Sequence, residues 1–168
     1  ILIPGADFLR GAVLSDTQTI KALLSLEALV IGEEEPPRVV AEIFEAKNVR
    51  LARRAYQADI EIVSSDGVVS RLLAQNIRHP GLSRVYDEIL THQEGNEVYI
   101  READGLVGLK VEEIHGRFPN AVLMGLVRLS NGGFLPLLNP APGTHVAAGD
   151  RLVILAPSYE ESKPSESP

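Results

Sequence analysis

Cysteine and tryptophan are both missing from this sequence, and aromatic residues make up only 5% of its 168 residues. Without cysteine the chain can form no disulfide, no thiolate metal site and no cysteine nucleophile, which fits a reducing compartment. With so few aromatic rings it has little to stack on nucleic-acid bases. Acidic residues outnumber basic ones by 23 to 16, giving a net charge of −7. A phosphate-binding surface needs a basic cluster, so we expect no nucleic-acid partner.

Long apolar runs are missing too. No apolar segment approaches the roughly 20 residues that a membrane-spanning helix needs. The sequence opens at Ile1, with no initiator methionine and no signal peptide, so we expect a piece of a longer polypeptide. What is present is the composition of a globular protein, 45% hydrophobic and 23% charged, in a chain long enough to bury a sizeable core.

Strand and helix patterns alternate along the first half of the chain. Ser15 with Gln18 matches the capping box that opens a helix, and Ser65 with Asp66 fits the start of another. Strands that alternate with helices over short links predict βαβ units and a parallel sheet. The expected strands are residues 1–3, 39–44 and 58–63, and the expected helices begin at Ser15, at Asn48 and at Ser65.

A break at His79-Pro80-Gly81 precedes a strongly amphipathic helix over residues 82–90. Apolar residues recur there at the spacing of one helix face. The stripe consists of Leu82, Val85, Tyr86, Ile89 and Leu90. Because no strand follows directly, this helix leaves its sheet, and we expect its stripe to pack on a partner subunit.

Beyond the amphipathic helix the pattern predicts a small α+β module. The strand at residues 97–101 alternates around Val98 and Ile100, as a half-exposed strand does, and Asn131-Gly132 is a hairpin signal. From residue 158 the chain is rich in Ser, Glu and Pro, so we expect a disordered tail. The module's other elements are a short helix at residues 111–118 and strands at 121–127, 134–138 and 152–156.

The sequence contains no recognisable motif for dinucleotide binding or for catalysis. No Gly-x-Gly-x-x-Gly follows a predicted strand, so the chain has no dinucleotide fingerprint. The four histidines are far apart in sequence, and none has a serine or carboxylate at the spacing of a triad or zinc motif. We therefore expect a protein that is not an enzyme.

Carboxylates gather where ligands of open α/β sheets bind. Glu42 lies within the second predicted strand and Glu45 just past its end, while Asp7 and Asp16 follow the first strand. The carboxyl ends of parallel strands meet at one edge, and Ca²⁺ prefers oxygen ligands. These four residues are candidate Ca²⁺ ligands. The alternative is structural: capping and solvated acids, with Arg38 or Lys47 as the partner of Glu42.

The segment "VAAGDRL" at residues 146–152 has the form of a turn found in lipoyl and biotinyl carrier folds, but the hairpin tip lacks their lysine. As structure, Gly149 permits an unusual backbone angle and Asp150 can hydrogen-bond its own turn. We therefore interpret this turn as the start of the last strand.

Four segments carry a family resemblance: "ADIEIVSSDGVVSRLLAQNIRHPGLSRVYDEIL", "EGNEVYI", "FPNAVLMGLVR" and "LLNPAPGTHVAAGDRLVILA". Together they resemble the cytosolic region of the CASTOR/POLLUX ion-channel family and, more broadly, an RCK (regulator of K⁺ conductance) module. The resemblance covers residues 39–156 best. Its most specific pieces are Gly95-Asn96-Glu97 and the occurrence of Asn139-Pro140 followed by Gly149-Asp150.

The resemblance implies a domain order and an α/β fold class. Residues 1–77 correspond to the C-terminal half of a Rossmann-like parallel-sheet subdomain. Residues 78–93 correspond to a helical crossover and dimerisation helix, and residues 94–157 to a small α+β RCK C-terminal subdomain. The expected disordered tail is residues 158–168.

The resemblance also implies a function. Such modules dimerise within a gating ring under a cation pore, so we expect a ligand-sensing cytoplasmic domain at the inner face of a membrane. In calcium-gated relatives, acids at the end of the corresponding strand bind Ca²⁺. Glu42 matches that position, whereas Glu45 is one position away from a second acid, where this chain has Phe44. The alternative is a regulatory nucleotide-binding subunit of a K⁺ uptake transporter.

Overall fold

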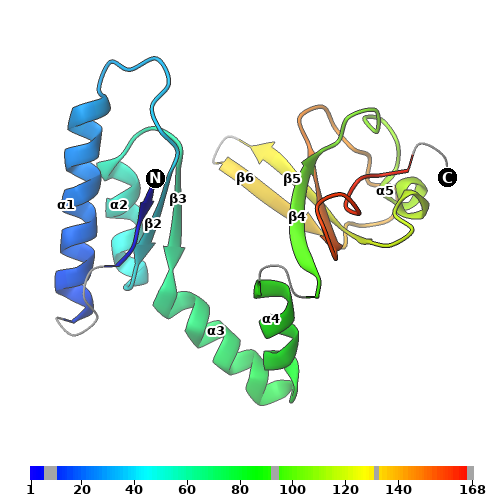
Figure 1. Ribbon diagram of the computed structural model, residues 1–168, viewed down its shortest axis with the longest axis horizontal. Helices are drawn as coiled ribbons and strands as arrows, with labels where there is room; N and C mark the ends of the chain where they lie inside the picture. The colour runs from blue at the N-terminus through cyan, green and yellow to red at the C-terminus, as the bar shows by residue number, and fades with distance from the viewer. Residues whose placement is uncertain (6–10, 92–94, 131–132, 166–168) are drawn as a thin grey trace. The chain divides into compact units, whose positions relative to one another are not determined.

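The protein is described by a computed structural model, which covers residues 1–5, 11–91, 95–130 and 133–165. The chain forms two compact units, Ile1–Pro80 and Gly81–Pro168 (Figure 1). The first contains a three-stranded sheet and the second a four-stranded sheet. This mixed α/β architecture confirms the predicted fold class. The division between the units falls inside the segment predicted as the crossover.

The first unit is built on a parallel sheet with the strand order β1-β2-β3. Ala41 of the central strand pairs with Ile3 on one side and with Ile62 on the other. Parallel strands need a crossover between them, and a helix supplies it each time. The elements are β1 (Leu2–Ile3), α1 (Ala12–Val30), β2 (Val39–Ile43), η2 (Ala46–Asn48), α2 (Val49–Ala55), β3 (Ile60–Ser64) and α3 (Ser65–Arg78).

The core of the first unit forms between β2 and the two helices α1 and α2. Alternate residues of β2 (Val39, Ala41 and Ile43) are fully buried, as the period of two in a strand requires. Leu23 of α1 and Tyr56 after α2 complete the core. The Tyr56 hydroxyl donates to the carbonyl oxygen of Pro37, which satisfies a phenol that is otherwise buried among apolar side chains.

The start of α1 differs from the prediction. The helix begins at Ala12, and its N-cap residue is Gly11, which has a φ of 86°. No side chain caps this end of the helix. The Ser15 amide donates to the Gly11 carbonyl oxygen at 3.2 Å, so Ser15 lies inside the helix and is not its cap. The prediction failed because the three residues before Ser15 are apolar and helix-compatible and extend the helix by almost a turn.

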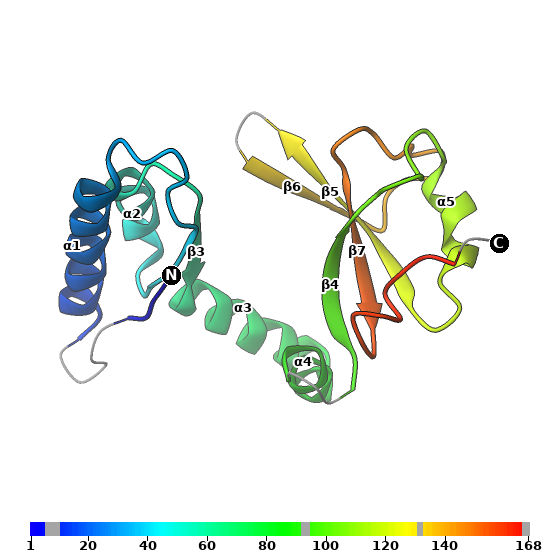
Figure 2. The ribbon, with the colours of Figure 1, turned by 45° about the horizontal axis from the view of Figure 1, so that its top comes forward.

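Neither α3 nor α4 (Leu82–Leu90) buries a side chain completely. Figures 1 and 2 both show α3 running away from the sheet that it follows. On α4, Val85 and Leu90 of the predicted stripe are exposed, whereas Leu82, Tyr86 and Ile89 are half-buried. The apolar stripe of α4 is therefore only partly covered by the described residues of the chain. No helix in the described ranges is both long enough and apolar enough to cross a membrane.

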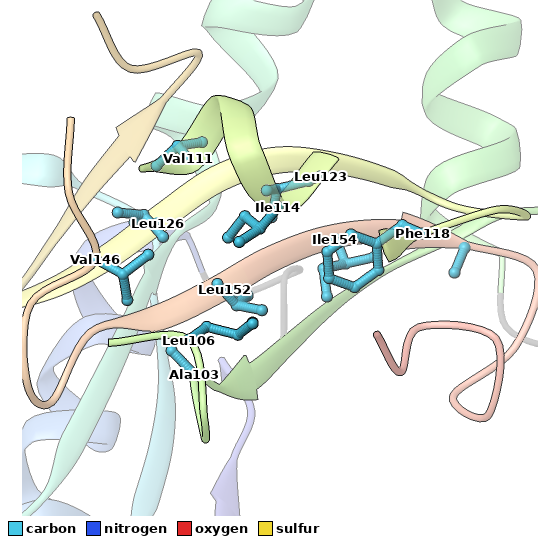
Figure 3. Packing of buried hydrophobic residues seen from close by; sticks show 11 residues of the cluster. Ala103, Leu106, Val111, Ile114, Phe118, Leu123, Leu126, Val146, Leu152 and Ile154 are labelled. Carbon is cyan, nitrogen blue, oxygen red and sulfur yellow. The ribbon is translucent and has the colours of Figure 1, made fainter. Parts of the chain in front are cut away.

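The second unit is an antiparallel sheet with the strand order β4-β7-β5-β6. One face is covered by α5 and η3, and Figure 3 shows the packed side chains. Ile114, Leu126, Leu152 and Ile154 are completely buried there. The elements are β4 (Glu97–Glu102), α5 (Val111–Ile114), η3 (His115–Arg117), β5 (Val122–Ser130), β6 (Gly133–Leu138) and β7 (Arg151–Ala156).

A bulge in β5 depends on Gly125. The register against β7 shifts between Leu123 and Gly125, and Gly125 has a φ of 151°. A Cβ at this position would lie 2.2 Å from the carbonyl oxygen of Leu137. Only glycine therefore lets β5 curve between its two neighbouring strands.

The two aliphatic residues of β4 lie on its exposed side. The strand is half-exposed, as predicted, but Val98 and Ile100 point outward while Tyr99 and Arg101 are half-buried. Arg101 donates to the Tyr159 carbonyl oxygen at 3.0 Å, and its guanidinium lies 4.1 Å from the centre of the Tyr159 ring. Arg101 faces inward because the chain beyond residue 157 supplies its partners.

The expectation of a tail that is disordered from residue 158 is wrong for residues 158–165. Ser162 is completely buried and accepts a hydrogen bond from Arg101. The Ser165 amide donates to the Arg117 carbonyl oxygen at 2.8 Å. Composition predicted disorder because this segment has little apolar surface, but polar contacts with β4 and η3 place it.

The outermost strand of the second unit, β6, leaves apolar side chains exposed. Phe134, Leu135 and Leu138 are each about half exposed, and Pro136 in the same strand has no N–H to donate. The predicted hairpin tip, Asn131-Gly132, lies outside the described residues, but the flanking pair Ser130 and Gly133 is in register.

Candidate functional site at the end of the parallel sheet

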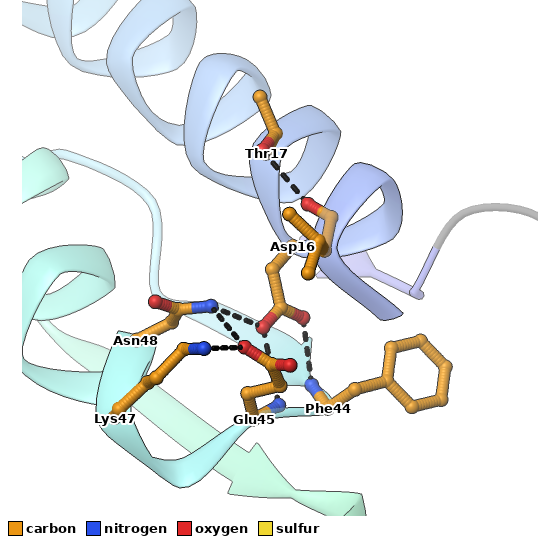
Figure 4. Close-up of polar contacts among 7 residues, drawn as sticks. Asp16, Thr17, Phe44, Glu45, Lys47 and Asn48 are labelled. Atoms are coloured by element: carbon orange, nitrogen blue, oxygen red, sulfur yellow. Dashed lines mark hydrogen bonds and ion pairs between the residues drawn. The ribbon is translucent and has the colours of Figure 1, made fainter. Parts of the chain in front are cut away.

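Asp16 ties α1 to the end of β2. Its side chain is 1% exposed, and its carboxylate accepts from the backbone amides of Phe44 at 2.8 Å and Glu45 at 3.1 Å (Figure 4). The side-chain amide of Asn48 donates to the same carboxylate at 2.7 Å. Three N–H donors hold the carboxylate in one orientation. Asp16 therefore fixes where the chain turns out of β2.

Glu42 connects β2 with the segments on either side of it. Its carboxylate accepts from the Gly5 amide at 2.9 Å and from the hydroxyl of Ser65. Ser65 was predicted to cap α3, but its hydroxyl is committed to Glu42, and Ser64 occupies the N-cap position without a side-chain cap. A charged side chain in an apolar strand needs such partners.

Glu45 pairs with its neighbour in η2. Its carboxylate lies 2.7 Å from Lys47 Nζ, and Asn48 Nδ2 donates to it at 3.4 Å. The hydrogen bond and charge of Glu45 raise the pKa of Lys47 above its ordinary value. Asn48 thus contacts both Asp16 and Glu45, as Figure 4 shows.

The structure therefore gives protein partners to each described candidate for the calcium site. Asp16 and Glu45 share Asn48, and Glu42 is engaged with Gly5 and Ser65. Asp7 lies outside the described residues. Across the described parts of the chain, no three histidine or acidic side chains gather closely enough to hold a metal ion. The proposed partners of Glu42 are corrected too: Lys47 pairs with Glu45, and Arg38 pairs with Asp59 at 3.3 Å.

A pocket of about 500 Å³ lies at this end of the first unit. It is bordered by the first turns of α1 and α3 and by the residues that follow β2. The sequence predicts one of its lining residues, Glu45, as a candidate ligand and Ser15, Ser65 and Asp66 as helix caps, but it does not predict a pocket. Its lining residues are Gly11, Ala12, Ser15, Phe44, Glu45, Ser65, Asp66 and Val69.

In the second unit the buried acid is Asp150, and its partner is a cation. Arg128 donates to Asp150 through Nε at 2.8 Å and through Nη2 at 2.6 Å. The Ala147 amide donates to the same carboxylate at 2.8 Å. The guanidinium of Arg128 holds the pKa of Asp150 below its usual range. This arrangement stabilises the turn before β7, which agrees with the structural interpretation of the Gly149-Asp150 turn.

Comparison with known proteins gives a family match over most of the chain. A family model described as "Castor and Pollux, part of voltage-gated ion channel" matches residues 66–168. The probable ion channel POLLUX of Arabidopsis thaliana is 29% identical over 168 residues, which is all of this chain and 20% of that protein. The ion channel CASTOR of Lotus japonicus is 29% identical over 154 residues, 92% of this chain and 18% of that protein. The chain thus spans about a fifth of the length of these relatives.

Two solved structures align with the chain at a lower level of similarity. The "GsuK channel bound to NAD" and the "Crystal Structure of the GsuK RCK domain" each have 20% sequence identity and a TM-score of 0.37, and each alignment covers 96% of this chain. The alignments cover 25% and 30% of the two solved chains. At this TM-score the likeness supports no further conclusion.

Proposed function

This chain belongs to the Castor and Pollux family of ion channels, and from that premise we propose that it is a cytosolic regulatory domain of RCK type. Copies of the domain assemble into a gating ring beneath a cation pore. A ligand that binds one ring shape more tightly shifts the population towards that shape and so opens or closes the pore. We propose no catalytic role, in keeping with relatives that are named as ion channels.

The observation that carries the proposal is the incompletely covered stripe of α4. A ring needs contacts between copies of the chain, and α4 presents an amphipathic face none of whose residues is buried. An apolar stripe of this kind marks an interaction surface, and a symmetric pairing of two copies would cover both stripes at once.

The first test replaces Val85 and Ile89 by aspartate. Burying these charges in the contact is unfavourable, so the double variant should be monomeric by light scattering where the wild type is not. The control variant, Ser83→Asp with Arg84→Asp, places two acids at exposed polar positions of α4, outside the apolar stripe, and should keep the wild-type mass although its charge change is larger. An unchanged mass in the Val85 and Ile89 variant contradicts the interface.

The second test asks whether the interface regulates conduction. The complete gene product that contains this chain is reconstituted into lipid bilayers, and its currents are recorded over a range of cytosolic Ca²⁺ concentrations. We expect the Val85→Asp, Ile89→Asp variant to lose the Ca²⁺ dependence of the current. If the variant is monomeric as an isolated domain but its current still depends on Ca²⁺ as in the wild type, the α4 contact is not needed for gating.

Ca²⁺ is the ligand that we propose from the family resemblance, with Glu42 and Glu45 among its ligands. Ca²⁺ takes six to eight oxygens, so a site with these two acids alone would be weak. Calorimetric titration of Ca²⁺ into the wild type and into Glu42→Gln tests the site directly. Heat in the wild type that is lost in the variant supports it, and no heat in either protein removes Ca²⁺ from the proposal.

A further inference from the structure

The four-stranded sheet of the second unit has two edge strands, and they differ in how they meet an added strand. β6 forms one edge and contains Pro136, which has no N–H to donate. β4 forms the other edge and runs over six residues without proline or glycine. Natural proteins normally block the edges of their sheets, so the unblocked edge of β4 indicates a strand partner.

The outer edge of β4 has backbone groups available for such a partner. Every residue of β4 is in register with β7 on the inner side. Among the residues that the structure describes, no backbone hydrogen bond joins residues 98–102 to an element other than β7. Alternate residues of a strand direct their N–H and C=O groups to opposite edges. The groups on the outer edge of β4 are therefore those that an added strand would use.

The side chains of β4 suit pairing with an identical strand. Val98 and Ile100 on the outer face are 42% and 54% exposed. Glu97 and Arg101 on the inner face are half-buried and lie about 13 Å apart along the strand. The partners of Arg101 are uncharged, namely the carbonyl oxygen and ring of Tyr159 and a serine hydroxyl. A carboxylate from a second chain would compensate the charge of Arg101.

Symmetry restricts the ways in which two copies of β4 can pair. Opposite residues of antiparallel strands lie on the same face of a sheet, and the two-fold axis of the pair is perpendicular to the sheet and keeps each face on its own side. The register must therefore be centred on one residue. Centring it on Tyr99 places Glu97 opposite Arg101 of the second copy, and Val98 opposite Ile100 of the second copy.

We propose that β4 pairs in antiparallel orientation with β4 of a second copy, in the register centred on Tyr99. Two ion pairs between Glu97 and Arg101 form on the inner face, and the aliphatic side chains of Val98 and Ile100 pack together on the outer face. Opposite charges and apolar pairs directly across from each other stabilise antiparallel strands. A register centred on Val98 or on Ile100 loses both ion pairs.

The inference rests on the proposed self-association through α4 and adds a second contact to the same dimer. A pairing of two short strands is marginal by itself, so the α4 contact has to bring the two copies together. Asn96, directly before β4, donates to Glu88 of α4 at 3.0 Å, which holds the end of α4 beside the start of β4. The strand pairing then joins the sheets of the two copies into one.

Disulfide trapping tests the register, because the chain has no cysteine of its own. Val98→Cys and Ile100→Cys are made as separate chains, mixed under reducing conditions and then treated with oxidised glutathione. In the proposed register the two cysteines face each other with Cα atoms about 5 Å apart, within disulfide range. We expect covalent heterodimers by mass spectrometry. Either variant alone places its two cysteines roughly 8 Å apart and should give at least about tenfold fewer covalent dimers.

The ion pairs are tested in the same two chains. Glu97→Arg, added to both, places an arginine opposite Arg101 and should lower the yield of heterodimers about fivefold, since like charges across strands are destabilising. Asp104→Arg is the matched control, because it also replaces an acid by arginine, at an exposed position beyond the end of β4, and should leave the yield unchanged. An unchanged yield in Glu97→Arg overturns the proposed ion pairs.

Light scattering on the same chain separates this proposal from the proposed function. A dimeric wild type, together with mixed cysteine variants that cross-link no better than either variant alone, overturns the pairing with a second copy and does not affect the α4 contact. A monomeric wild type overturns both. Val122→Cys on β5, where Val122 is 60% exposed, reports random collision, and covalent dimers from it at the same yield would also overturn the register.

Discussion

The two units of this protein each bury an aspartate, but they satisfy it differently. Asp16 in the first unit is 1% exposed and accepts hydrogen bonds from neutral amides only. Asp150 in the second is 2% exposed and accepts hydrogen bonds from Nε and Nη2 of one guanidinium. Burial alone therefore does not distinguish an acid that could contact a ligand from an acid that only supports the fold. The charge of the donors does, because a carboxylate compensated by arginine has less left to offer a ligand.

The largest effect should come from breaking the pair in the second unit. Arg128→Met leaves the Asp150 carboxylate buried with the Ala147 amide as its remaining donor, and such an unpaired charge costs about 3 kcal/mol. Urea unfolding measures the loss. The double variant Arg128→Met, Asp150→Asn should be more stable than the single one, because it removes the buried charge. A double variant that is less stable than Arg128→Met would show that the charge is not the cause.

A smaller effect is expected for the aspartate of the first unit. Asp16→Asn replaces an acceptor oxygen by an amide that faces other donors, so the free energy of unfolding should fall by about 2 kcal/mol. Thr17→Ala, one residue away and exposed, is the control and should change stability little. If Asp16→Asn were as stable as the wild type, the three hydrogen bonds of Asp16 would not hold α1 to β2.

Lowering the pH should destabilise the second unit through Asp150. The folded-state pKa of Asp150 is lowered by Arg128. Its contribution is therefore fully present above the unfolded-state pKa of about 4 and is lost as the pH falls through the lower, folded value. Hydrogen exchange of the β5 and β7 amides should show protection falling below about pH 4. The decline should be shallower in Arg128→Met, and equal slopes would mean that the pair does not set it.

The smallest effect is expected from the end of the chain. Deleting residues 158–168 removes the partners of Arg101 and exposes part of β4. Because these contacts are few and partly exposed, we expect the melting temperature to fall by only about 3 °C. Arg101→Ala should reproduce most of this shift. An unchanged melting temperature after the deletion would restore the expectation that the segment contributes nothing to the fold.

Local patterns predicted the elements well. The short apolar runs predicted β1, β2 and β3, and their alternation with helices predicted a parallel sheet, which is confirmed. The hydrophobic spacing of α4 predicted its limits, Leu82–Leu90. These features depend on the period of side chains along one element, which the sequence displays directly. The family prediction is confirmed as well, because whole segments match and not single residues.

Partners between distant residues could not be predicted in the same way. The structural alternative for Glu42 named Arg38 or Lys47 as its partner, both close in sequence, but its donors are Gly5 and Ser65. A strand brings together residues that are far apart along the chain, and several donors compete for one carboxylate. The calcium site stays a prediction for the same reason, since the oxygens that would complete it must come from other segments.

The orientation of β4 shows a further limit of periodicity. Alternation correctly indicated a half-exposed strand, but it did not say which side the core would occupy. Tyr99 and Arg101 face inward because the segment after β7 contacts them. A period of two fixes only that neighbouring residues face opposite sides.

Pro136 in the outermost strand, β6, has a consequence for how the protein behaves at high concentration. An edge strand with exposed Phe134, Leu135 and Leu138 is the kind of segment on which chains from other molecules add strands and aggregate. Pro136 lacks the N–H that such an added strand would use, so a continuous ladder cannot extend outward past it. The proline thus acts as a gatekeeper against aggregation, and it leaves the apolar side chains of β6 accessible to a partner that binds through side-chain contacts alone.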